Sequence, residues 1–530
     1  MTALPPPAAD PARLPWCLAL ACGAAAVLLF AFGVSQRVGY PHELEWMEGA
    51  LADHAWRVAN GLPLYCAPTA EHVPFLYAPL LFWLGGLGIR LGCDEILALR
   101  LVAIAFTVGS AMLVGHWVRN ACGRVVPGLV ASGLFVAGYG WLAWWYDLAR
   151  NDTLFVFFCL ATGYQLQRGG ARRWLWAGLL ATLALLAKQS AVMWLPAIAV
   201  GAACLHWRTA LCFAATAAVG SAAVLGVMHW SSDGWSTFFL FEMPRHHGIV
   251  GENKLGFWLH DLVPMTPLLV LGLAGFVAQW RTGVRREALF LAAFGSGALA
   301  TSWLSRMHVG GFDNVLMYGF AGACVLGPIA AARASGALRV VAVLVLLAQF
   351  AWLGEQAWQR GSATLLPSAA HRQAHDELRS WVAAQPGPVW IPGHGAISTR
   401  AGKGTGAHGQ AIFDLMQLLP RNEGGFDLEA LIDRRRLAHL SLRAQQALGG
   451  FVDSTVAALR EHHFAAVVLE HGTDRFDLVF APGLWGDDQK LGTTDDTYLR
   501  APGPLVVDGR AIQPLLGYEV HSPFALLPRR

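Results

Sequence analysis

The sequence has little charge. Asp, Glu, Lys and Arg make up 14% of its 530 residues, whereas hydrophobic residues make up 55%. An ordinary soluble domain has about 25% charged residues. An ionisable group in hydrocarbon costs several kcal/mol, so long uncharged runs predict a protein that spans a membrane. The net charge of +3 gives no support to a nucleic-acid partner, which would favour a strongly basic surface.

Motifs for cofactors are also missing. None of the nine cysteines falls in a C-x-x-C pair, so the sequence carries no metal or redox motif of that kind. The glycine-rich segment Gly402–Gly409 is not a P-loop, because Lys403 is followed by Gly instead of Ser or Thr. The cofactor stays undefined: a divalent metal is possible, with no clear ligand motif. Cys66 and Cys93 could form a disulfide if their polar-flanked region lies outside the cytoplasm.

What the sequence does have is a series of apolar runs. A transmembrane helix needs about 20 mostly apolar residues. About eleven runs qualify, near residues 15–35, 98–118, 126–145, 152–167, 174–187, 190–206, 209–229, 260–280, 288–304, 314–332 and 338–356. The run Phe75–Leu91 is apolar too, but counting it as a span would invert every later loop. We interpret it as a re-entrant or interfacial helix within a long first external loop, Gln36–Leu97.

The arginines between these runs predict the orientation. They gather in alternate loops, at Arg119, Arg124, Arg168, Arg172, Arg173, Arg208, Arg281, Arg285, Arg286, Arg333 and Arg339, on the same side as Arg13 near the N-terminus. Short loops rich in Lys and Arg are typical of the cytoplasmic side. We therefore expect a multi-pass protein of the inner (plasma) membrane, with a cytoplasmic N-terminus and an external C-terminus.

After Trp358 the sequence becomes mixed and polar. Glu377–Ala383 and Ser454–His462 have helical patterns, whereas Pro388–Ile391 and Phe464–Leu469 resemble strands. This predicts an extracytoplasmic α/β domain over residues 359–530. The expected fold is thus an all-α polytopic membrane domain over residues 1–358, followed by that soluble domain.

Ionisable residues gather on the predicted external side. The first loop contributes His42, Glu43, Glu45, Glu48 and Asp53, and later loops contribute Tyr146–Asp152, Glu242–Gly248 and Arg306–Asn314. Taken singly, most of these residues are explained as solvated loop residues or helix caps. Lys188 is different, since it interrupts a stretch of Leu, Ala, Val and Trp. A lysine there is costly unless it is paired or lines a cavity, which indicates an anionic partner, either a carboxylate or a bound phosphate.

Several short motifs, in this order, resemble those of a known family. They are Glu43–Ala50, Ala59–Tyr65, Tyr77–Trp83, Leu99–Leu101, Arg150–Asp152, Ala187–Gln189 and His308–Asn314. Together they resemble the glycosyltransferase-C superfamily, in particular its bacterial branch related to protein O-mannosyltransferases and lipid A aminoarabinose transferases. The resemblance covers roughly the first 330 residues. The chain departs from the family at the acidic "D-E" pair, which here is Met47-Glu48 with Glu45 nearby.

The resemblance implies a membrane glycosyltransferase. Such an enzyme moves a sugar from a polyprenyl-phosphate donor to a hydroxyl of a lipid, glycan or protein acceptor at the external membrane face. The reaction needs a base for the acceptor hydroxyl and cations for the phosphate. The expected base is Glu45 or Glu48, with Glu43 as a further carboxylate and Asp152 orienting acceptor or base. The expected phosphate ligands are Lys188 and Arg150, followed by Arg245, His246, Arg306 and His308, and Asn314 belongs to a structural turn.

Two other functions stay open at this point. A lipid or sugar transporter, or a flippase, would favour paired repeats and broken helices at the membrane midplane. The sequence shows neither of these features. A catalytically silent scaffold is the other alternative, because the acidic motif is irregular.

Overall fold

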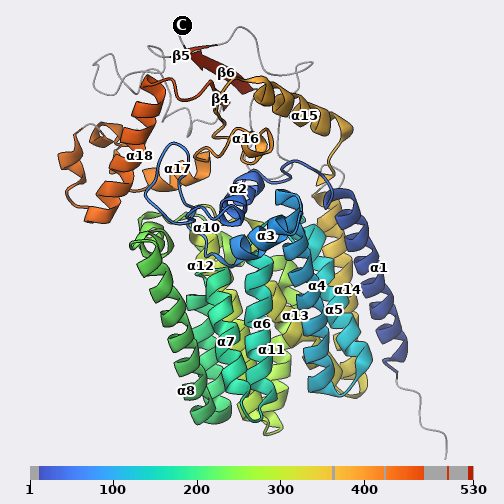
Figure 1. The fold of residues 1–530 in the computed structure, drawn as a ribbon. Helices are drawn as coiled ribbons and strands as arrows, with labels where there is room; N and C mark the ends of the chain where they lie inside the picture. The colour runs from blue at the N-terminus through green and yellow to red at the C-terminus, as the bar shows by residue number, and fades with distance from the viewer. Residues whose placement is uncertain are drawn as a thin grey trace, which may run out of the picture.

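The protein is a helical bundle with a smaller mixed part at one end. The computed structural model describes residues 11–360, 365–422, 425–431, 433–470, 498–500 and 523–528. The N-terminal end of α1 lies at the end of the bundle away from the smaller part (Figure 1). Seven helices of the described chain are long and apolar enough to cross a membrane, so the chain is a multi-pass membrane protein.

The long helices follow the predicted apolar runs. They are α1 Arg13–Arg37, α4 Glu95–Cys122, α5 Val125–Trp141, α6 Asp152–Arg168, α7 Arg173–Ala187, α8 Ala191–Ser231, α11 Thr266–Arg281, α12 Arg285–Met307, α13 Leu316–Arg333 and α14 Gly336–Gln359. Short elements join them: α9 Trp235–Thr237, η1 Phe238–Glu242, η2 Met243–His246, α10 Asn253–Gly256, η3 Phe257–Asp261, η4 Val263–Met265 and η5 Asp313–Val315. Since η1 and η3 are π-helical, the chain between α8 and α11 departs from regular helix in two places.

Helix α8 contains two of the predicted runs. A straight helix of its 41 residues would be about 60 Å long. Yet Gln189, just before α8, donates a hydrogen bond at 3.4 Å to the carbonyl of Leu240, which lies in η1, the second short element after α8. The backbone of His206 is not helical, with φ −152° and ψ 104°. The chain therefore reverses direction at His206, and both ends of α8 lie at the same end of the bundle.

The first loop holds two short helices, α2 Glu48–Ala59 and α3 Leu80–Arg90. With 11 residues, α3 is about 16 Å long, too short for a hydrocarbon layer of about 30 Å. It packs on α2, where a Cβ added to Gly86 would meet the Val58 side chain at 2.9 Å. The apolar run Phe75–Leu91 thus contains one short helix, which packs on α2 within the first loop.

Cys66 and Cys93, whose pairing the sequence left open, are both free in the structure. The Cys66 thiol lies instead beside the Arg57 side chain, where burial is the largest influence and raises the pKa of the thiol. Cys93 follows α3, one residue before the Asp94 carboxylate that caps α4.

The part after α14 combines helices and short strands. The helices are α15 Ala369–Ala384, α16 Ile397–Arg400, α17 Gly409–Met416, η7 Leu428–Leu431, η8 Arg434–Leu437 and α18 Leu442–Arg460. The strands are β1 Val389–Trp390, β2 Arg421–Asn422, β3 Gly425–Phe426, β4 Ala466–Glu470, β5 Tyr498–Arg500 and β6 Pro523–Pro528. One sheet has the order β1-β4-β6-β5, with β1 parallel to β4 and the other pairs antiparallel. The predicted helix Ser454–His462 corresponds to the second half of α18.

This C-terminal part rests directly on the first loop. The ring of His394 lies 2.8 Å from the Glu43 carboxylate, and both side chains are buried. The hydroxyl of Thr399 donates to the Asp53 carboxylate at 2.6 Å. A Cβ added to Gly49 would meet the Gly395 carbonyl oxygen at 2.3 Å, so α2 touches the backbone of the C-terminal part. The first loop and the C-terminal part therefore together cover this end of the bundle.

Candidate functional site

A cavity of about 360 Å³ lies at the end of the bundle that carries the C-terminal part. The first loop, the α7–α8 junction, the segment around η2, the turn before α13 and helix α17 all contribute to its lining. Its polar lining residues are Glu45, Tyr77, Arg150, Lys188, Gln189, Ser190, Arg245, His247, Ser305, His308, Asn314, Gln410 and Asp414. The rest of the wall is largely apolar. The cavity thus combines an apolar lining with a few charged groups that point into it, as is typical of ligand sites.

Glu45 is the carboxylate of the first loop that lines this cavity. One of its oxygens, Oε2, lies 3.4 Å from the Arg150 guanidinium and accepts from the backbone N–H of Met47 at 3.3 Å. The other oxygen, Oε1, is buried and has no hydrogen-bond partner among the described residues. Burial raises the pKa of Glu45 to about 7, against the opposing influence of Arg150. A carboxylate with this pKa and a free oxygen at a cavity is suited to accept a proton near neutral pH.

Arg150 lies next to Glu45 and is held on several sides. Its guanidinium donates to the Tyr77 hydroxyl at 3.0 Å and stacks over the rings of Tyr77 and Trp145, each 5.3 Å away. Its Nε–H is buried without a partner among the described residues. Arginine always carries its charge and presents several donors in a fixed plane. Arg150 thus offers a fixed positive charge at the cavity wall.

Lys188 occupies the break between α7 and α8, and a carboxylate pairs with its buried ammonium. Its ammonium lies 2.6 Å from Asp152, the first residue of α6, and 2.7 Å from the Tyr318 hydroxyl. Asn314 donates its amide to the other Asp152 oxygen at 3.0 Å. Lys188 and Asn314 line the cavity, whereas Asp152 does not. Asp152 is therefore placed to position Lys188 and Asn314 from behind, with no direct access to the cavity.

The four weaker phosphate candidates divide into two pairs. Arg245 and His308 line the cavity, and Arg245 is exposed. His246 and Arg306 are not among its lining residues. Arg306 instead lies 2.8 Å from Asp261 and donates to the Gly311 carbonyl, so it ties down the turn before α13. The sequence could not separate these pairs, because all four fall in segments that the sequence predicts to be polar loops.

Glu48 does not reach the cavity. Its carboxylate accepts two hydrogen bonds from the Arg100 guanidinium, at 2.6 and 3.0 Å. It also accepts from the backbone N–H groups of Leu44 and Ala149, both at 2.7 Å. Both side chains of the ion pair are fully buried. Although burial alone would raise the pKa of Glu48, Arg100 and these hydrogen bonds lower it. Glu48 thus joins the first loop to α4 and has no oxygen left for a substrate.

Glu43 is likewise occupied away from this cavity. Its carboxylate lies 2.8 Å from His394 Nδ1 at the contact with the C-terminal part. It lines a separate gap of about 10 Å³, together with His42, His375 and Arg400. That gap has room for a water-sized group only. Of the three expected glutamates, only Glu45 is thus placed for chemistry in the cavity.

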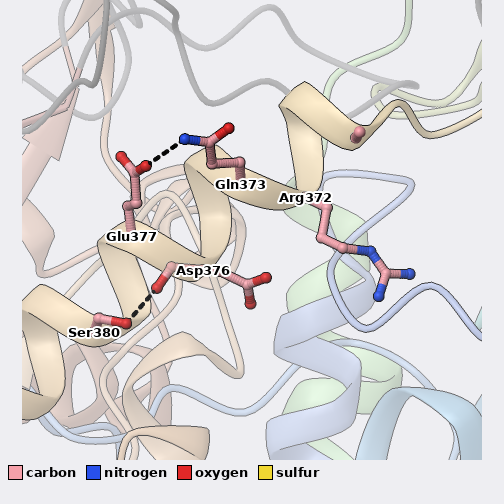
Figure 2. Close-up of a pocket in the computed structure, with 6 residues that line it drawn as sticks. Arg372, Gln373, Asp376, Glu377 and Ser380 are labelled. Carbon is pink, nitrogen blue, oxygen red and sulfur yellow. Dashed lines mark hydrogen bonds between the residues drawn. The ribbon is translucent and has the colours of Figure 1, made fainter.

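A second hollow, of about 450 Å³, lies along α15 in the C-terminal part (Figure 2). All of its lining residues come from that helix, including Arg372, Asp376 and Ser380. Gln373 donates to Glu377 at 2.9 Å along the helix surface, as Figure 2 shows. Because only one element contributes, no groups converge there on a ligand. This hollow is a surface feature and no candidate site.

Some residues in or behind the cavity wall were not predicted. Tyr318, which does not line the cavity itself, bonds both Asp152 and Lys188 from an apolar run, where nothing in the sequence distinguishes it. Tyr77 stood in a motif, but as a helix entry and not as the partner of Arg150. Gln410 and Asp414 lie four residues apart on α17, which begins at the end of the glycine-rich segment Gly402–Gly409, where the sequence shows no binding motif. In the described part of the chain, His, Cys, Asp and Glu form no group of three or more that could hold a metal ion.

Comparison with known proteins gives a fold but no close relative. No protein-family model and no curated sequence matches the chain. Among solved structures, ArnT from Cupriavidus metallidurans in the apo state superposes with a TM-score of 0.58 at 12% identity, over 97% of this chain and 98% of that one. The same protein bound to undecaprenyl phosphate gives a TM-score of 0.54 over the same shares, also at 12% identity. The resemblance seen in the sequence is therefore confirmed at the level of the fold, and the chain has the fold of the glycosyltransferase-C superfamily.

Proposed function

We propose that the protein is a glycosyltransferase that moves a sugar from a polyprenyl-phosphate donor to an acceptor hydroxyl. The observation that carries this proposal is the cavity, where Glu45, whose Oε1 has no hydrogen-bond partner in the described part of the chain, shares one space with Arg150, Lys188 and Arg245. A solved structure with the same fold binds undecaprenyl phosphate, which supports a lipid-phosphate donor for this chain. Cations beside one potential base are what a transfer with a phosphate leaving group requires.

The proposed step forms one bond and breaks one. The acceptor oxygen attacks the anomeric carbon of the sugar, and the bond from that carbon to the phosphate oxygen breaks. The electron pair leaves with the polyprenyl phosphate, whose growing charge Arg150, Lys188 and Arg245 stabilise. Glu45 takes the proton of the acceptor hydroxyl. Tyr77 and Asp152 position Arg150 and Lys188, respectively, for this task.

The cavity also has an apolar side that suits a lipid. Val192 at the start of α8 and Leu304 near the end of α12 line the cavity and are exposed on the bundle. Met193 beside Val192 has the same two properties. In a membrane these side chains face acyl chains, so a polyprenyl tail can remain in the lipid while its phosphate reaches the cations. This apolar side of the cavity is consistent with a donor that never leaves the membrane.

We further propose eleven spans with the cavity outside the cytoplasm. The described helices account for eleven crossings if α8 counts twice, because the chain reverses at His206. We expect reporter fusions after Arg172 and Arg285 to report the cytoplasm, and one after Trp358 to report the external side, owing to the arginine-rich loops. A cytoplasmic signal after Trp358 would place the cavity on the wrong side for this proposal.

Lys188→Ala should weaken donor binding strongly. The change removes a cavity-facing ammonium that opposes the phosphate charge, so we expect a loss of about tenfold to a hundredfold in affinity. Binding of a labelled polyprenyl phosphate to the purified protein measures it. The matched control is Arg333→Ala. Arg333 is the last residue of α13, at the end away from the cavity, and its cation is paired with Glu287. Wild-type affinity in Lys188→Ala would remove Lys188 from the site.

The proposal as a whole is tested with the purified protein and a panel of polyprenyl-phosphate sugars. We expect free polyprenyl phosphate to appear from at least one donor, together with the glycosylated acceptor when membrane lipids or glycans are supplied. A flippase would instead move intact donor across a proteoliposome bilayer without cleaving it. A scaffold would do neither. Cleavage by the wild type and not by Glu45→Gln therefore separates the three functions.

A further inference from the structure

One wall of the cavity comes from the C-terminal part and contains none of the proposed phosphate ligands Arg150, Lys188 and Arg245. Gln410 and Asp414 lie four residues apart on α17, so their side chains share one face of the helix. The Gln410 amide donates to the Asp414 carboxyl at 2.6 Å, and both residues line the cavity. Helix α17 is fixed in place, because the N–H of Ala407 just before it donates to the Ala70 carbonyl of the first loop at 2.8 Å.

His247 faces the same wall with unused hydrogen-bonding capacity. Its side chain is only 3% exposed, yet neither ring nitrogen has a hydrogen-bond partner among the described residues. Its Nε2 lies 3.5 Å from the Asp414 carboxyl. Buried polar groups are normally paired, and leaving one unpaired costs about 1–3 kcal/mol. An imidazole that lines a cavity and makes no hydrogen bond to any described residue therefore points to a ligand.

Burial opposes charge on the wall formed by Gln410, Asp414 and His247. It lowers the pKa of His247 to about 3 and raises the pKa of Asp414 well above its usual range. The wall offers hydrogen-bond donors and acceptors, whereas Arg150, Lys188 and Arg245 line the same cavity with positive charge.

One short segment contributes both to the positively charged part of the cavity and to the wall that contains His247. Arg245 and His247 are two residues apart, at the end of η2. In a polyprenyl-phosphate sugar, the group attached to the phosphate is the sugar. On the basis of the proposed function, we infer that Gln410, Asp414 and His247 bind hydroxyl groups of the transferred sugar, so that the C-terminal part selects a neutral, hydroxylated sugar.

A matched control pair exists on α15. Gln373 and Glu377 form the same kind of amide–carboxyl hydrogen bond four residues apart, but on the outer surface of the C-terminal part (Figure 2). Gln373→Ala removes a helix-surface pair of equal chemistry without touching the cavity. It should leave both turnover and sugar selection unchanged.

The test compares Asp414→Ala and Gln410→Ala with the wild type on a series of donors. The series holds polyprenyl-phosphate sugars that each lack one hydroxyl, and one that carries an amino group instead. Since each bound hydroxyl contributes about one hydrogen bond, the wild type should lose about tenfold in kcat/KM on the donor without it. Asp414→Ala should lose about tenfold on the full sugar and nothing further on that deoxy donor. The wild type should also disfavour the amino sugar.

Unchanged discrimination among the deoxy donors in Asp414→Ala would overturn the inference. So would a loss of discrimination that concerns only deoxy acceptors, because the wall would then hold the acceptor. If Asp414→Ala fails to fold, Asp414→Asn and Gln410→Ala keep the test valid, since the asparagine preserves the shape of the side chain. Binding of sugar-free polyprenyl phosphate must stay at wild-type strength in every variant used.

A binding competition separates this inference from the proposed function. In the wild type, the sugar-bearing lipid should bind more tightly than bare polyprenyl phosphate, and Asp414→Ala should abolish the difference. If that difference is found but no donor is ever cleaved, the transfer reaction is refuted and the sugar site stands. If donors are cleaved but the competition shows no preference for the sugar-bearing lipid, the sugar site is refuted and the transfer stands.

Discussion

Glu45→Gln should abolish most of the turnover while donor binding survives. The amide keeps the shape of the side chain but cannot accept the proton of the acceptor hydroxyl. Loss of a general base lowers kcat by about two orders of magnitude or more, whereas the contacts of Arg150 and Lys188 to the phosphate remain. The measurement is single-turnover release of polyprenyl phosphate, alongside the affinity for the intact donor.

The same carboxylate predicts the pH dependence of the reaction. Burial raises the pKa of Glu45 to about 7, and the base is active only when deprotonated. The rate of transfer should therefore fall as the pH drops through about 7 and level off above it. In Glu45→Gln the residual rate should lose this dependence. A pH profile that is the same in the variant and the wild type would assign the proton transfer to another group.

Normal turnover in Glu45→Gln would refute the proposed base. The neighbouring carboxylates then offer no ready substitute, because Glu43 and Glu48 are occupied by His394 and Arg100. Asp414 would be the next candidate, since it is another carboxyl group that lines the cavity. The Asp414→Asn variant already needed for the sugar test decides this point as well.

The long helices of the structure coincide with apolar runs of the sequence, because hydropathy along one chain determines where such helices form. Even the two runs within α8 were separated, as Arg208 and the polar residues around His206 interrupt the apolar pattern. Helix α2 begins at Glu48 and leaves Glu45 in the preceding turn, so Glu45 and Glu48 do not share a helix face although they are three residues apart.

The side-chain partners were less accessible to prediction. Lys188 was expected to pair with a carboxylate or bind a phosphate, and the structure shows the carboxylate to be Asp152, 36 residues away. The pairing of Glu48 with Arg100 spans 52 residues and depends on how the first loop folds back on α4. Such contacts are set by tertiary packing, which a single sequence does not reveal. The α17 wall was missed for the same reason.

The ion pair between Glu48 and Arg100 leads to the second large expected effect, which is on stability. Arg100 is fully buried in α4, and its guanidinium also donates to the backbone carbonyls of Arg37, Tyr40 and His42. The pair thereby fixes the start of the first loop, on which Glu45 depends for its position. Removing one partner of a buried pair leaves the other charge uncompensated, which typically costs about 3–5 kcal/mol.

We therefore expect Glu48→Gln to destabilise the protein by about 3–5 kcal/mol, and more than Glu45→Gln does, because Glu45 lies 3.4 Å from its partner Arg150 whereas Glu48 makes two short hydrogen bonds to Arg100. Thermal unfolding of the purified protein in detergent measures the difference, and Glu45→Gln serves as the matched control because it is the same substitution three residues away. Replacing both partners, as in Glu48→Gln with Arg100→Met, should recover part of the loss, since no buried charge then remains unpaired. A Glu48→Gln protein with the stability of the wild type but no turnover would contradict this assignment. It would make Glu48 part of the catalytic machinery and require the first loop to open during the reaction, because the carboxylate is otherwise enclosed by Arg100, Leu44 and Ala149.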